Sequence, residues 1–284
     1  MAQFTNQATL SYGNTVTNSN IAIGEISEVI SVTKTAINAT YGQNDTITYI
    51  ISILNSGSSA FNNLTLTDNL GTYDFGTSSL TPLNYTEGTL RYYVNGVLQA
   101  SPNVTVNQDS IVVNGIGVPA GGNAILVYEV STNAYAPLLS DGQITNTGTV
   151  SGMGITPVLA EETVAAEASP NLTITKSISP VPVAEGEEVT YTILIQNTGN
   201  TPLVATDNAV ITDLFDPILT NLTVTFNGTV WAEGTEYNYN EATGFFETVP
   251  SNITVPAATF VQDPTTGAWS ITPGTSTLII RGTI

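Results

Sequence analysis

The segment ITYIISILNSG, residues 47–57, decides the fold that this sequence predicts. Apolar side chains alternate with Thr and Ser along it, which is the period-2 pattern of a half-buried β-strand, and Asn-Ser-Gly marks a turn at its end. The segment VTYTILIQNTG, residues 189–199, repeats this pattern. The preceding segments ISVTKT, residues 30–35, and LTITKS, residues 172–177, keep the same spacing. A repeat this long indicates two copies of a domain, because solenoid units are much shorter.

The remainder of each copy also has the pattern of short strands. Leu66-Thr67-Asp68 matches Ile211-Thr212-Asp213, and Asn95-Gly96 matches the hairpin signal Asn227-Gly228. No long stretch has the helical period of 3.6. The sequence therefore predicts an all-β chain of two tandem immunoglobulin-like β-sandwich domains. We expect an N-terminal donor strand and connector (1–28), domain 1 (29–152), a linker (153–169) and an incomplete domain 2 (170–284).

Domain 2 is expected to be incomplete because of a displaced repeat. The segment FTNQATLS, residues 4–11, resembles ITNTGTVS, residues 144–151, which closes domain 1. No such segment follows TLIIRGTI, residues 277–284. We therefore predict that residues 4–11 complete domain 2 of the next subunit by donor-strand complementation. The side chains expected to enter domain 2 are Phe4, Asn6, Ala8 and Leu10.

Donor and acceptor lie on different surfaces, so repetition of this contact produces an open, head-to-tail homopolymer unless a ring closes. The chain's main expected partner is therefore itself. An alternative from the same residues is that the N-terminal strand closes its own domain 2.

The two lysines of the chain, Lys34 and Lys176, occupy the same position in the repeat. The period-2 pattern places each of them on the apolar face of its strand. Asp68 and Asp213 share a face with apolar neighbours in the same way, as do Asn146 and Asn6. A buried charge without a partner costs several kcal/mol, so these groups are expected to meet.

A buried Lys–Asp–Asn cluster can form an isopeptide bond. Burial lowers the pKa of a lysine and raises that of a carboxylic acid, which leaves a neutral amine beside a protonated acid. The amine attacks the Asn side-chain carbonyl, the acid transfers protons, and ammonia leaves. We predict an intramolecular bond between Lys34 and Asn146, assisted by Asp68. The predicted intermolecular bond joins Lys176 to Asn6 of another copy, assisted by Asp213.

Two other interpretations of these residues are open. The lysine and aspartate can form an ordinary buried ion pair, with Asn146 as a hydrogen-bonding filler. The assisting acid can also be Asp45 or Glu187, each of which precedes a strand and is expected to be solvated in a turn.

Composition excludes several kinds of partner. With 4 basic and 23 acidic residues the net charge is −19, which repels nucleic acid and anionic membranes. The chain contains no Cys and no His, which removes disulfides, thiol chemistry and the usual zinc ligands. We expect no cofactor and no metal, with weak calcium binding at Asp263 or Glu233 as the alternative. Residues 1–11 follow a strand pattern rather than the apolar core of a signal peptide.

A different class of function is that of an adhesin or carbohydrate-binding module. The stretch from Ala232 to Trp269 contains aromatic residues that suit such a surface, although they can also pack onto the sandwich. These residues are Tyr237, Tyr239, Phe245, Phe246 and Trp269. We expect no enzymatic turnover, because the carboxylates show no paired spacing typical of a glycosidase.

The quoted motifs resemble a known family. The segments VTKT (32–35), NSG (55–57), TD (67–68) and TN (145–146) are similar to the conserved-repeat surface domain, domain of unknown function eleven, of Gram-positive bacteria. The second repeat shows the resemblance better, through TYTI (190–193) and NTGN (197–200). The two-domain layout is similar to clostridial proteins that build endospore appendages. The resemblance implies a structural role at the cell or spore surface, with other surface or spore-coat proteins as further partners.

Overall fold

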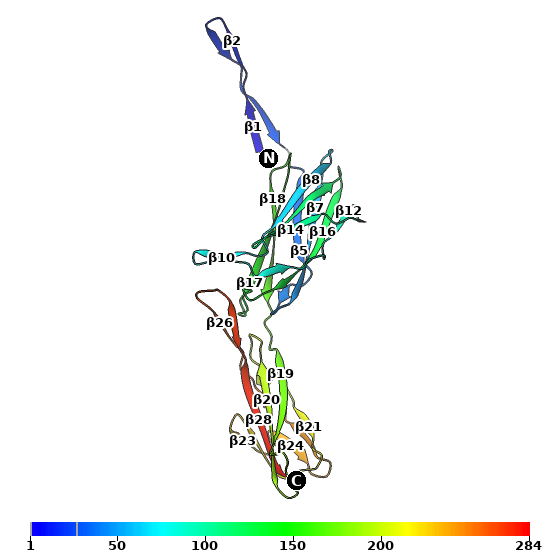
Figure 1. The fold of residues 1–284 in the computed structure, drawn as a ribbon, viewed down its shortest axis with the longest axis vertical. Helices are drawn as coiled ribbons and strands as arrows, with labels where there is room; N and C mark the ends of the chain where they lie inside the picture. The colour runs from blue at the N-terminus through cyan, green and yellow to red at the C-terminus, as the bar shows by residue number, and fades with distance from the viewer. Residues whose placement is uncertain (1, 27) are drawn as a thin grey trace. The chain divides into compact units, whose positions relative to one another are not determined.

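The computed structural model describes residues 2–26 and 28–284, whose regular secondary structure consists almost entirely of β-strands (Figure 1). Within these ranges the single helical segment is the 3-10 turn η1 (Ala205–Asp207), and no helix is long and apolar enough to cross a membrane. The chain divides into two compact units, residues 1–136 with 143–164 and residues 137–142 with 165–284. The structure confirms the predicted all-β fold of tandem immunoglobulin-like sandwiches.

Domain 1 contains two six-stranded sheets. The first has the order β13-β12-β16-β7-β5, with β11 also paired to β16, and the second has the order β14-β15-β8-β17-β18-β6. The strands of the first sheet are β5 (Ile30–Ala36), β7 (Thr46–Asn55), β11 (Leu83–Tyr85), β12 (Arg91–Val94), β13 (Val97–Gln99) and β16 (Asn123–Thr132). Those of the second are β6 (Thr40–Tyr41), β8 (Phe61–Asp68), β14 (Asn103–Val106), β15 (Ile111–Val118), β17 (Gln143–Ser151) and β18 (Val158–Ala166). A separate hairpin joins β9 (Tyr73–Phe75) to β10 (Ser78–Leu80).

Domain 2 contains a five-stranded sheet of order β19-β20-β28-β22-β23 and a three-stranded sheet of order β21-β25-β24. The larger sheet consists of β19 (Leu172–Ser179), β20 (Glu188–Asn197), β22 (Thr220–Phe226), β23 (Thr229–Trp231) and β28 (Gly274–Thr283). The smaller consists of β21 (Thr212–Leu214), β24 (Tyr237–Asn240) and β25 (Phe245–Thr248). Strands β26 (Thr259–Gln262) and β27 (Trp269–Thr272) form a hairpin.

The repeated Asn-x-Gly motif, residues 55–57 and 197–199, forms the same hydrogen-bonded turn in both domains. Asn55 and Asn197 are fully buried at the ends of β7 and β20. The side-chain carbonyl of each accepts the backbone N–H of the glycine two residues later, at 2.9 Å in both domains. The amide nitrogens donate to loop carbonyls, those of Ser59 and Pro119 in domain 1 and of Thr201 and Pro256 in domain 2. The Asn-x-Gly pattern therefore fixes the turn after this strand.

Strand β18 corrects the predicted end of domain 1. The sequence assigned residues 153–169 to a linker, whereas Val158–Ala166 forms a strand of the second sheet. Its alternate residues Ala160, Val164 and Ala166 are buried, so the strand contributes to the core. Domain 1 therefore closes with the two strands β17 and β18 rather than with β17 alone.

Domain 2 has no counterpart of β17 or β18 among its described residues. In domain 1, β8 lies between β15 and β17. The corresponding strand β21 pairs only with β25 in the part of the chain that the structure describes. The sequence predicted that domain 2 lacks one strand. Because the closing element of domain 1 has two strands, the described residues of domain 2 lack the counterparts of both.

The N-terminal arm, residues 2–26, is a hairpin. Strand β1 (Ala2–Asn6) pairs with β4 (Ala22–Ile26), and β2 (Thr9–Tyr12) pairs with β3 (Thr15–Asn18), all antiparallel (Figure 1). The sequence assigned residues 12–28 to a connector, so β3 and β4 correct that assignment. Residues 1 and 27 of the predicted segment lie outside the described residues. Phe4 and Leu10 are more than half exposed on this arm.

Candidate cross-linking sites

Lys34 and Asp68 meet in the core of domain 1. Lys34 lies on β5 and Asp68 at the end of β8, each in phase with apolar residues of its strand. The Nζ atom of Lys34 is 2.5 Å from Oδ2 of Asp68, and both side chains are completely excluded from solvent. The period-2 pattern predicted this juxtaposition.

Two further donors complete the hydrogen bonding of the Asp68 carboxyl. The hydroxyl of Tyr128 donates to Oδ2, and the backbone N–H of Leu70 donates to Oδ1 at 2.9 Å. Tyr128, on β16, was not predicted from the sequence. Its phase with the buried residues Leu126 and Val130 is the signal that marks it as inward-facing.

Burial shifts the proton affinities at this site. The pKa of Lys34 is lowered by loss of solvation, which the negative charge of Asp68 opposes. A lowered pKa raises the fraction of neutral amine, the form that can act as a nucleophile. Burial raises the pKa of Tyr49 and of Tyr128, so both phenols keep their protons. The Lys34 ammonium lies 4.7 Å from the centre of the Tyr49 ring.

Asn146 is a fully buried amide without conventional hydrogen bonds. Neither its nitrogen nor its oxygen has a hydrogen-bond partner of normal geometry. The amide lies close enough to the Tyr49 hydroxyl to lower the pKa of that phenol, against the larger effect of burial, which raises it. Asn146 lies on β17, two residues before Gly148, which is opposite Asp68 in the ladder. Tyr49 is therefore a common neighbour of Lys34 and Asn146. An unsatisfied buried amide costs about 1–3 kcal/mol, which disfavours the interpretation of Asn146 as a hydrogen-bonding filler.

Glu162 is a second carboxylate of this site that the sequence interpretation missed. It lies on β18, in phase with Ala160 and Val164, and its Oε1 accepts the backbone N–H of Ala36 at 3.2 Å. Its charge acts on Lys34, in the direction of a higher pKa. Alternation along residues 158–166 would have found it, had that range been treated as a strand.

The alternative acids lie in turns. Oδ2 of Asp45 accepts the N–H of Gly42 at 2.6 Å, and Oε2 of Glu187 accepts the N–H of Ala184 at 3.3 Å. Both residues are exposed, as expected for solvated turn residues.

The equivalent site in domain 2 is open. Lys176 and Asp213 form an ion pair, but their side chains are 39% and 16% exposed. The Lys176 ammonium lies 4.5 Å from the centre of the Tyr191 ring. Every residue of β19 is exposed, whereas Ile30 and Lys34 on the corresponding strand β5 are buried. An apolar groove of about 180 Å³ lies beside this site. It is lined by Leu172, Thr173, Ile174, Ile195, Leu203, Ala209, Val210, Ile211 and Ile253.

Asn6, the predicted partner of Lys176, lies on β1 of the arm. It faces Ala22 across the β1–β4 ladder and is exposed. Asn6 is two residues from Phe4, so both lie on the same face of the hairpin.

The aromatic residues between Ala232 and Trp269 lie largely in the core of domain 2. Tyr237, Tyr239 and Phe246 are buried and belong to one apolar cluster. Trp269 is half-buried, and Phe245 is the exposed member. Of the two interpretations of these aromatic residues, packing onto the sandwich therefore holds for Tyr237, Tyr239 and Phe246.

The described residues contain no group of three or more carboxylates that could hold a metal ion. Asp263 instead caps a turn, accepting the backbone N–H groups of Thr266 and Thr265, which lower its pKa.

Comparison with known protein families and with characterised proteins finds no match. Several solved structures are similar in part. The major pilin subunit of Bacillus cereus is 10% identical, with 96% of this chain and 73% of the pilin covered and a TM-score of 0.37. The pilus backbone protein of Streptococcus pneumoniae is 12% identical, with 86% and 55% covered and a TM-score of 0.35. The collagen-binding domain of a Staphylococcus aureus adhesin is 14% identical, with 50% and 99% covered and a TM-score of 0.31.

Proposed function

We propose that this chain is the structural subunit of a fibre at a bacterial cell or spore surface. In this proposal the N-terminal arm of one copy completes domain 2 of the next by donor-strand complementation. Isopeptide bonds then lock each domain, Lys34 to Asn146 within a copy and Lys176 to Asn6 between copies.

The observation that carries the proposal is the difference between β8 and β21. Strand β8 has β15 on one side and β17, which carries the buried Asn146, on the other. Strand β21 carries the equivalent Asp213 but pairs only with β25 among the described residues. Residues 4–11 match β17, with Asn6 in the place of Asn146. In the proposal the arm therefore gives domain 2 the strand and the amide that β17 gives domain 1.

The proposed reaction needs no cofactor. The neutral amine of the lysine attacks Cγ of the asparagine, and a new C–N bond forms. The carboxylic acid donates a proton to the amide and takes one from the attacking nitrogen. The C–NH₂ bond then breaks and ammonia leaves. The proton that the acid takes from the lysine nitrogen replaces the one that it gave to the amide, so the acid ends in its original state. One secondary amide and one ammonia replace one amine and one primary amide.

Intact mass spectrometry under fully denaturing conditions tests this proposal. A ladder of multimers is expected, in which every subunit has lost one ammonia at Lys34–Asn146 and every junction has lost another. A monomer lighter by two ammonias would instead show that the arm closes its own domain 2. An unmodified monomer would refute the bond chemistry, and electron microscopy would then show whether non-covalent fibres form.

Matched asparagine variants separate the two bonds. Asn6→Ala is expected to give fibres that dissociate into monomers on boiling in detergent, because strand exchange does not need the amide. Asn146→Ala is expected to leave the ladder intact while each subunit loses one ammonia fewer than the wild-type subunit. Multimers of Asn6→Ala that survive boiling would rule out Asn6 as the intermolecular partner.

A further inference from the structure

The arm and the closing strands of domain 1 have the same pairing register. Thr5 lies opposite Ile23, and Asn6 lies opposite Ala22. The offset of 140 that relates residues 4–11 to 144–151 converts the first pair into Thr145 and Thr163. The hydroxyls of these two threonines are 2.8 Å apart across β17 and β18. The same offset converts the second pair into Asn146 and Glu162.

We propose that domain 2 of a second copy receives the whole hairpin, residues 2–26, as a preformed two-stranded unit. Strands β1 and β2 then pair with β21, as β17 pairs with β8, and β4 lies along β19, as β18 lies along β5. This inference rests on the proposed function and goes beyond it, because donor-strand complementation requires only residues 4–11.

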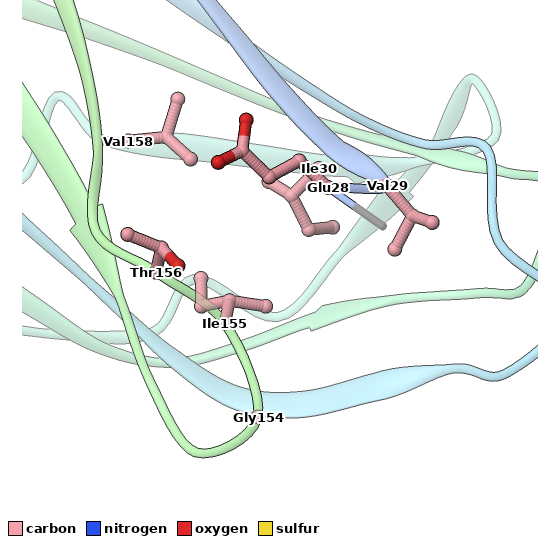
Figure 2. A pocket seen from close by; sticks show the side chains of 7 residues that line it. All are labelled: Glu28, Val29, Ile30, Gly154, Ile155, Thr156 and Val158. Atoms are coloured by element: carbon pink, nitrogen blue, oxygen red, sulfur yellow. The ribbon is translucent and has the colours of Figure 1, made fainter. Parts of the chain in front are cut away.

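Strand β18 shows why a second strand is needed. In domain 1 it lies beside β5 at two points. Val158 and Ile30, at the starts of the two strands, line the same small pocket (Figure 2), and Glu162 accepts the N–H of Ala36 at the end of β5. A single strand beside β21 would restore the β17 ladder but would leave β19 without the neighbour that β18 gives to β5.

Domain 2 exposes apolar side chains at both places that the hairpin would cover, on β19 and in the groove lined by Ile211. Leu172, Ile174 and Ile178 are 40%, 57% and 43% exposed on β19. The ladder of domain 1 places Val150 opposite Leu66, and the repeat converts these residues into Leu10 and Ile211. Ile211 lines the open groove of domain 2, so Leu10 would enter that groove. Burial of this apolar surface would drive the association.

The two strands of the arm already fit one another as a core unit. The ring of Phe4 lies over Gly24, where an added Cβ would be 2.3 Å from the ring. The equivalent residues of domain 1 are Ile144 and Val164, both buried. In the arm, a phenylalanine and a glycine thus replace the isoleucine and valine of domain 1. The apolar face of the arm therefore depends on residues from both strands. Ala22 replaces Glu162, so the junction would lack the second carboxylate of domain 1.

A disulfide across the arm tests whether the hairpin is donated intact. Thr5→Cys/Ile23→Cys places cysteines at directly opposite residues, whose Cα separation of about 4.5–5.5 Å suits a disulfide. The chain has no other cysteine. We expect the oxidised and reduced forms to give the same multimer ladder. Val261→Cys/Ser270→Cys, in the β26–β27 hairpin, controls for the presence of a disulfide.

The outcomes separate this inference from the proposed function. A ladder from reduced but not oxidised Thr5→Cys/Ile23→Cys would show that β1 leaves β4 before insertion. The hairpin inference would then be wrong while donor-strand complementation stands. Absence of multimers and fibres from the wild-type protein would overturn both.

A second variant addresses the role of β4 without a disulfide. Ala22→Pro/Ile23→Pro removes two of the backbone N–H donors of β4 and leaves residues 4–11 unchanged. We expect at least a tenfold loss of polymerisation rate. The control Asn20→Pro/Ile21→Pro falls outside the strands and is expected to retain most of the rate. Equal rates for the two double-proline variants would contradict the inference.

Discussion

The ammonium of Lys34 lies 2.5 Å from the carboxylate of Asp68 with both side chains excluded from water. The equivalent pair of domain 2, Lys176 and Asp213, has the same contact but is partly open to solvent. The difference lies in the surrounding strands, because β17 and β18 complete the sandwich around the first pair. The second pair lies where those strands have no counterpart among the described residues of domain 2.

The two lysines are expected to differ in their contribution to stability. In an Asn146→Ala background, where the intramolecular bond cannot form, Lys34→Met leaves Asp68 buried without its cation. We expect the free energy of unfolding to fall by about 3–5 kcal/mol. Lys176→Met should change it by about 0–1 kcal/mol, because that pair is partly solvated. Urea titrations followed by circular dichroism measure both, and equal losses would contradict the assigned burial.

The Lys34 contribution is expected to depend on pH. Burial lowers its pKa in the folded chain below the ordinary lysine value of 10.5, so between the folded and unfolded pKa values the unfolded chain holds more protons on this residue. Stability therefore rises with pH across that interval, and the penalty for burying the ammonium is largest below it. Relative to Lys34→Met, the unlinked Asn146→Ala protein should gain stability on going from neutral to alkaline buffer. A gap that stays constant or narrows would contradict a lowered pKa.

Tyr128 is expected to support Asp68. Tyr128→Phe removes the hydroxyl that donates to Oδ2 and should cost about 1.5–3 kcal/mol, the range for hydrogen bonds to charged groups. It should also slow loss of ammonia from domain 1 after refolding, which a mass-spectrometric time course would record. Tyr85→Phe is the control, since its ring lies 6.3 Å from that of Tyr128 and its hydroxyl has no hydrogen bond to Asp68. Equal rates for the two variants would remove Tyr128 from the proposed reaction.

The residue types at Phe4 and Gly24 in the arm can be replaced by those at the equivalent positions of domain 1, Ile144 and Val164. Gly24→Val introduces side-chain atoms where the Phe4 ring lies, so we expect it to reduce polymerisation. The double variant Gly24→Val/Phe4→Ile reproduces the Ile144 and Val164 pair and should recover it. The multimer ladder measures both. If the single variant Phe4→Ile, which keeps Gly24, polymerised as well as the double variant, the two strands would not act as one unit.

Much of the fold and half of the site follow from local patterns. Alternation along residues 47–57 and 189–199 identified the strands, and the same period placed Lys34, Asp68 and Asn146 on inward faces. Alternation was less informative at β18 because its inner face includes Glu162 and alanines, which reduces the contrast in hydropathy. Glu162 therefore lies within the range predicted as a linker, and β4 lies within the range predicted as a connector.

The sequence alone determined the duplication, the strand faces and the repeat of lysine and aspartate, because a period of two fixes the side of a sheet to which each side chain points. Only the tertiary structure decided which strands are neighbours. It brought Tyr128 from β16 and Glu162 from β18 to the Lys34–Asp68 pair, and it left the Asn146 amide without hydrogen bonds of normal geometry. It also paired β1 with β4 in the register of β17 with β18. Such pairings depend on contacts between residues far apart in the chain, which a local period does not encode.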